Sequence, residues 1–215
     1  AAKQVIEPLA SSAPIEIAIV GDVDEDKAIA AVAQSFGALP TRELEAPDYS
    51  AARQASFAQD LSPRTLTHEG PADQAMLLDF WKTTDDSDYK REIVGSVAAR
   101  AIDILMRDKL REELGATYGA QVSSSMSDVY KDFGTFSVAA TLSPDRLEEA
   151  QTAIGEVLAK LRAEPIDDDL LLRARAPVIE SIEKSRRENG FWLGVASEAQ
   201  SRADRLERVR EQLDQ

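Results

Sequence analysis

Two side chains between Leu105 and Gly119 have types and a spacing that suggest chemistry. This segment reads Leu-Met-Arg-Asp-Lys-Leu-Arg-Glu-Glu-Leu-Gly-Ala-Thr-Tyr-Gly, so a charged amphipathic helix ends at glycine and a tyrosine follows. Arg111 and Tyr118 therefore flank a helix-to-strand turn. A guanidinium and a phenol held there can both donate hydrogen bonds to one carbonyl oxygen. The structural alternative is an arginine that favours the helix C-terminus and a tyrosine that begins a strand.

Other residue types exclude several kinds of site in this chain. There is no cysteine and a single histidine, His68, whose neighbours Gly70 and Pro71 prevent the helix that a two-histidine zinc motif needs. Gly115–Gly119 lacks the lysine and serine of a phosphate-binding loop. The acidic run 167–169 is explained by the N-terminus of a helix, where the macrodipole favours carboxylates. We expect no metal site and no complete catalytic centre in this chain.

Composition limits the partners. The 215 residues are 43% hydrophobic, which is enough for a buried core, and 39 acidic against 25 basic side chains give a formal charge of -14. This charge repels nucleic acids and anionic lipid surfaces, so we expect no nucleic-acid partner. No apolar run approaches the roughly 20 residues that span a bilayer, and we expect no membrane insertion. The absence of cysteine leaves the compartment open.

Hydrophobic periodicity predicts one layered α+β domain over residues 1–215. The expected elements are strands at 15–21, 64–68, 74–81, 120–126 and 133–141, and helices at 24–36, 89–114, 143–163 and from 167 almost to the terminus, interrupted at 189–190. This β-α-β-β-α-β-β-α-α order favours a mostly antiparallel sheet with helices on one face. Thr41–Pro63 is expected to be a long surface connection that Tyr49 and Phe57 hold in place.

Both ends of the chain read as parts of something larger. Residues 1–13 resemble the tail of a preceding segment. Residues 201–215 are highly charged, with Leu206, Val209 and Leu213 as the apolar stripe, so we expect a helix that packs on residues outside this sequence.

Three segments together resemble the pitrilysin/insulinase family of zinc metallopeptidases. They are Ile-Ala-Ile-Val-Gly-Asp-Val-Asp with its helix and Phe-Gly-Ala-Leu-Pro (residues 17–40), Leu-Arg-Glu-Glu-Leu-Gly-Ala-Thr-Tyr-Gly (110–119) and Asn-Gly-Phe-Trp-Leu (189–193). The resemblance implies a clamshell of repeated α/β domains whose zinc is held by an inverted His-x-x-Glu-His helix. That helix is absent here, so the chain resembles a later, non-zinc C-terminal domain.

The resemblance also implies a role for the pair at the helix end. In such domains an arginine and a tyrosine at this spacing reach the substrate carbonyl near the metal, and Arg111 and Tyr118 match them. The implied partners are a peptide substrate and the zinc-bearing half, with zinc expected in that N-terminal half. Bacterial two-half relatives are often exported, which favours the periplasm over the cytoplasm.

Two other readings stay open. The first is a non-catalytic scaffold or partner subunit of the same fold, like respiratory-complex core subunits or processing-peptidase partners. The second is an acidic interaction module unrelated to the family, which a structure without paired strands would favour.

Overall fold

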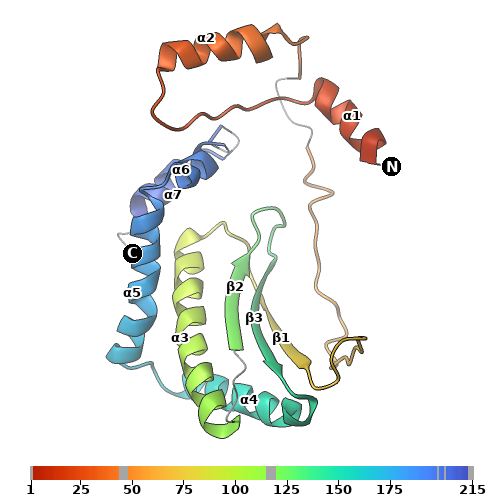
Figure 1. Cartoon of the computed structure of the whole chain (residues 1–215), viewed down its shortest axis with the longest axis vertical. Coiled ribbons are helices and arrows are strands. Elements are labelled where there is room, and N and C mark those ends of the chain that lie inside the picture. Colours follow the sequence, from red (N-terminus) through yellow and green to blue (C-terminus); the bar gives the residue numbers. More distant parts are fainter. Residues whose placement is uncertain (1, 44–47, 115–119, 198, 201, 213–215) are drawn as a thin grey trace. The chain divides into compact units, whose positions relative to one another are not determined.

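The computed structural model describes residues 2–43, 48–114, 120–197, 199–200 and 202–212, without the side chains of residue 5 and residues 111–114. The chain forms two compact units (Figure 1). One comprises residues 1–51 with 181–215, and the other comprises residues 52–180.

The unit formed by residues 52–180 is built on a three-stranded antiparallel sheet in the order β1-β3-β2. Its strands are β1 (Ala75–Thr83), β2 (Ala120–Met126) and β3 (Gly134–Leu142). β3 is central: Val138 lies opposite Asp79 of β1 and opposite Val122 of β2. The predicted strands at 74–81, 120–126 and 133–141 are thus confirmed.

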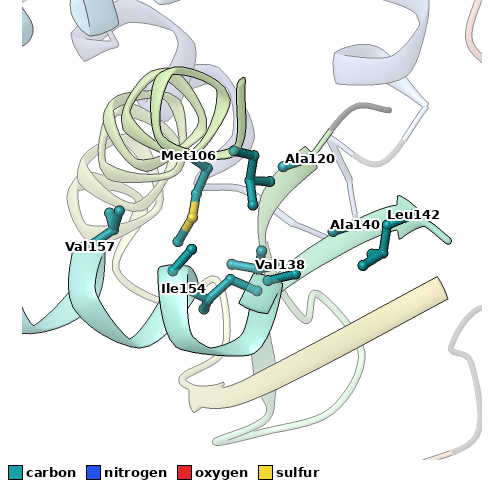
Figure 2. Close-up of a cluster of buried hydrophobic side chains, with 10 residues drawn as sticks. Met106, Ala120, Val138, Ala140, Leu142, Ile154 and Val157 are labelled. Carbon is teal, nitrogen blue, oxygen red and sulfur yellow. The ribbon is translucent and has the colours of Figure 1, made fainter. Parts of the chain in front are cut away.

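Helices cover one face of this sheet. They are α3 (Tyr89–Leu114) and α4 (Leu147–Ala163), the latter preceded by the 3-10 turn η2 (Pro144–Arg146). Apolar side chains of both helices meet the sheet in one core (Figure 2). The buried members are Met106, Leu110, Ala120, Val138, Ala140, Leu142, Ala150, Ala153, Ile154 and Val157. The expected α+β class, with an antiparallel sheet and helices on one face, is confirmed.

The opposite face of the sheet is open. Met76, Leu78 and Phe80 alternate along β1 with the core-facing residues and are 61%, 49% and 63% exposed. On β2 and β3 the polar pair Ser123 and Ser137 lies on the exposed side, with the two hydroxyl oxygens 2.9 Å apart. The two-residue period of the strands therefore separates a packed face from an open one.

A second apolar cluster joins α3 to α5 (Asp168–Ser185), which begins in this unit. Ala101 of α3 packs with Leu170 and Ala174 of α5, and all three are buried. α3 is thus a long helix that contacts the sheet, α4 and α5. These contacts on several sides determine the position of α3 along the part of the helix that precedes its C-terminal end.

In the unit formed by residues 1–51 and 181–215, the regular elements among the described residues are helices. Its elements are α1 (Ala2–Ser12), α2 (Glu25–Ser35), the 3-10 turn η1 (Phe36–Ala38), α6 (Asn189–Ala196) and α7 (Arg205–Glu211). The predicted N-cap of α2 is confirmed, because an Asp24 carboxylate oxygen accepts a hydrogen bond from the backbone N–H of Lys27 at 3.1 Å. The predicted interruption of the C-terminal helical region is present, but it lies at residues 186–188, between the end of α5 at Ser185 and the start of α6. The predicted position at 189–190 is wrong, because Asn189 and Gly190 form the first turn of α6.

The predicted strands at 15–21 and 64–68 are wrong for this structure. Residues 14–20 and 64–68 have no regular secondary structure, although Gly21 does form the expected bend with φ +151°. Ile15 and Ile19 are 44% and 49% exposed. Alternating apolar residues are compatible with a strand, but a strand also needs a neighbouring strand that supplies its backbone hydrogen-bond partners. Neither segment has one among the described residues.

An aromatic contact holds the connection that contains Phe57 against the unit formed by residues 52–180. Phe57 stacks on Phe133 with the ring centroids 4.5 Å apart and the rings inclined by 15°. The ammonium of Lys82 lies 5.2 Å from the Phe57 ring centroid, which adds a cation–π contact. The predicted role of Phe57 is confirmed.

Candidate functional site

The candidate pair lies at the junction between α3 and β2. Arg111 belongs to the final turns of α3, but its side chain lies outside the described part of the structure, and so does the whole of Tyr118. Their joint action on a carbonyl oxygen stays a prediction. The structure does describe the residues on either side of them.

Both ends of the segment that carries the pair are anchored in one apolar core. Leu110, directly before Arg111, is 5% exposed, and Ala120, two residues after Tyr118, is 6% exposed. Both belong to the cluster that contains Met106 and Val138 (Figure 2). These two buried residues fix the points at which the segment that carries Arg111 and Tyr118 leaves the core and returns to it.

An ion pair adds a polar anchor at the same end of α3. Lys109 Nζ lies 2.7 Å from Glu156 Oε2, so it joins α3 to α4. The Lys109 side chain is 27% exposed and the Glu156 side chain is 57% exposed. The contact therefore lies at the solvent edge of the packing between these helices.

Six residues before Lys109, α3 carries a buried acid that sequence reasoning did not single out. The Asp103 side chain is 8% exposed, and its Oδ2 lies 2.8 Å from Arg107 Nη2 and 3.7 Å from Arg100 Nη1. The i, i+3 and i, i+4 spacings bring both guanidinium groups to one side of the helix. The signal available in the sequence was the alternation of charge at spacings of three and four residues. The two arginines compensate a carboxylate that burial would otherwise disfavour.

A second buried acid fixes the β2–β3 loop. Asp85 is 8% exposed, and its carboxylate accepts hydrogen bonds from the backbone N–H of Ser87 at 3.1 Å and of Asp132 at 2.6 Å. The Ser87 hydroxyl, followed by the Asp132 and Ser87 N–H groups, lowers the pKa of Asp85 from its usual 3.8. Asp132 has φ +55°, an uncommon backbone conformation for aspartate that this contact helps to hold. The Asp-x-Ser spacing was the sequence signal.

The sequence predictions for the other polar groups agree with the structure. His68 is exposed, and its Nδ1 accepts a hydrogen bond from the Gly70 N–H at 2.8 Å. Asp167 caps α5 by accepting from the Leu170 N–H at 2.7 Å, and Asp169 lies 3.5 Å from Arg173. Over the described ranges, no group of three or more histidine, cysteine, aspartate or glutamate residues could hold a metal ion. The described side chains therefore do not fit a zinc site.

The sequence of residues 7–178 matches the family described as the peptidase M16 inactive domain. The chain belongs to the peptidase M16 family. The match includes the α3–β2 junction and both anchors of the candidate pair. Membership agrees with the resemblance drawn from residues 17–40, 110–119 and 189–193, and the matching domain is the one described as inactive.

Two kinds of known protein show similarity over parts of this M16 chain. Chloroplastic stromal processing peptidases from Oryza sativa subsp. indica and subsp. japonica are each 27% identical over 106 residues, which is 49% of this chain and 8% of theirs. The crystal structure of the periplasmic protease PqqL from Escherichia coli has a TM-score of 0.58 at 21% identity, covering 89% of this chain and 21% of PqqL. The latter supports the M16 fold.

This M16 chain spans a small share of those relatives, as the covered fractions show. Over the described residues, no helix is long and apolar enough to cross a membrane.

Proposed function

We propose that this chain is the non-zinc C-terminal domain of a zinc metallopeptidase and closes its substrate chamber. The observation that carries the proposal is the match of residues 7–178 to the M16 inactive domain. Within that match, Arg111 belongs to the last turns of α3, next to the buried Leu110, and Tyr118 follows the helix in the sequence. Arg111 and Tyr118 would donate hydrogen bonds to the substrate carbonyl oxygen.

The chemistry of these donors follows from their groups. A guanidinium keeps its charge at all physiological pH values, and a phenol is a neutral donor. Donors aimed at a carbonyl oxygen stabilise the negative charge that develops there during peptide hydrolysis. Zinc in the other half would supply the activated nucleophile. This chain would bind the oxygen and exclude water, and peptides would be the substrate class.

The test uses the complete peptidase with the substitutions Arg111→Ala and Tyr118→Phe. Each loses one donor to the oxygen, so kcat/KM for a fluorogenic peptide should fall about 100-fold. Zinc content and melting temperature should stay unchanged, since neither residue is proposed to bind metal or pack in the core.

Two substitutions serve as matched controls. Arg162→Ala removes an exposed arginine from the last turn of α4, and Tyr130→Phe removes a hydroxyl from a 40% exposed tyrosine. Both should leave turnover unchanged. If Arg111→Ala and Tyr118→Phe behave like these controls, the oxyanion role is wrong, and a scaffold or partner subunit becomes the better reading.

A further inference from the structure

The end of α3 has two kinds of anchor with different physical properties. Met106 and Leu110 of α3 belong to the same apolar core as Ile154 and Val157 of α4, and Figure 2 shows Met106 pointing toward α4. Apolar contacts hold the helices together but depend weakly on direction. The Lys109–Glu156 contact at 2.7 Å is charge-assisted and directional.

This ion pair lies in the same helical turn as the candidate arginine. Lys109 precedes Leu110 and Arg111 in the sequence, and the partner carboxylate comes from a different helix. The pairs Arg146–Glu149 and Arg173–Asp169 join residues three or four positions apart, so they cannot orient one helix against another. The Lys109–Glu156 pair can limit rotation of the last turns of α3 about the helix axis.

We propose that Lys109 and Glu156 form a positioning pair that sets the direction in which α3 presents Arg111 to the substrate carbonyl. The inference rests on the proposed function and adds two residues to it. Because Glu156 is 57% exposed, the pair should contribute little to stability. Misplacement of a catalytic donor by about 1 Å can cost roughly 100-fold in rate. The pair should therefore affect turnover more than folding.

The experiment measures kcat and KM of the complete peptidase carrying Glu156→Gln or Lys109→Met. Each should lower kcat by about five- to tenfold, a partial loss of the effect of one missing donor, with KM and melting temperature nearly unchanged. Lys109→Arg keeps the charge and should retain most of the activity. The double variant should be no slower than Lys109→Met alone, because that substitution already removes the contact with Glu156.

Glu149→Gln is the matched control. Glu149 lies on the same helix seven residues before Glu156, is 51% exposed and pairs with Arg146. Its removal should leave kcat unchanged. If Glu156→Gln is as active as Glu149→Gln while Arg111→Ala is slow, the positioning role is overturned and the proposed function stands.

A final cycle separates positioning from a general structural effect. In an Arg111→Ala background, Glu156→Gln should cause no further loss of kcat, because the group that it positions is gone. Additive losses would overturn the inference, since the pair would then act through something else. Full activity of Arg111→Ala alone would overturn both the proposed function and the inference.

Discussion

Substituting Asp85 by Asn should expose how strongly one buried carboxylate holds the β2–β3 loop. The carboxylate accepts from the backbone N–H groups of Ser87 and Asp132, and Asp132 is distant in sequence. An asparagine side chain has the same shape but only one acceptor oxygen, and its NH2 group would face one of these N–H donors. At least one charge-assisted hydrogen bond is therefore lost.

The expected cost follows from that lost contact. Hydrogen bonds to charged groups contribute about 1.5–3 kcal/mol, so the free energy of unfolding should fall by about 2 kcal/mol at pH 7. With a urea m-value of about 2 kcal/mol/M, the midpoint should move down by about 1 M.

The assay is urea unfolding of the isolated chain in a Trp192→Phe background. Trp81 then remains as the single tryptophan, and it packs against the core of the unit that contains Asp85. Its emission follows the unfolding of that unit.

Asp60→Asn is the matched control for this change. Asp60 accepts from the N–H of Ser62 at 3.0 Å and from its hydroxyl at 2.6 Å, which repeats the Asp-x-Ser arrangement on an exposed loop. It should not change the midpoint measurably. Equal midpoints for Asp85→Asn and Asp60→Asn would refute the reasoning from burial.

The same variant has a pH signature. The folded state lowers the pKa of Asp85 below 3.8, so its contribution to stability is present above the unfolded pKa and disappears as pH falls through the folded pKa. The difference between wild type and Asp85→Asn should be complete at pH 7 and shrink below about pH 4. A difference that stays constant from pH 7 to pH 2.5 would show that the carboxylate charge is not responsible.

Two further predictions concern backbone space and metal. Gly134→Ala should lower the free energy of unfolding by about 3 kcal/mol, because its Cβ would lie 2.2 Å from the Thr84 carbonyl oxygen and 2.8 Å from that of Ser125. Gly155→Ala meets nothing within 4 Å on α4 and should instead stabilise by about 0.5–1 kcal/mol; urea midpoints in which both variants move the same way would contradict this contrast. The isolated chain should bind no stoichiometric zinc and cleave no peptide, and one zinc per chain by metal analysis would overturn the domain assignment.

Local patterns were enough to predict the elements whose stability comes from nearby residues. The period of α3, the cap at Asp24 and the strands around the β2–β3 turn all depend on short-range spacing. The prediction of strands at 15–21 and 64–68 was wrong because a strand needs a neighbouring strand to pair with, and the periodicity of a segment does not identify that neighbour.

The candidate site divides in the same way. Residue type and spacing singled out Arg111 and Tyr118, and the structure adds what spacing cannot provide. Leu110 and Ala120 share one core, and Glu156 comes from another helix to meet Lys109. Contacts between residues far apart in sequence leave no local pattern, so the sequence did not single out Glu156.

The strand order β1-β3-β2 has a kinetic consequence. Met126 of β2 pairs with Gly134 across a short turn, whereas Ala75 of β1 pairs with Leu142 only after α3 and β2 have been made. Closing the longer loop costs more chain entropy, so the β2–β3 hairpin should form early and β1 should dock last. During synthesis β1 therefore waits with its core-facing Leu77 and Trp81 uncovered, in addition to Met76, Leu78 and Phe80 of the open face, which exposes this strand to aggregation before folding is complete.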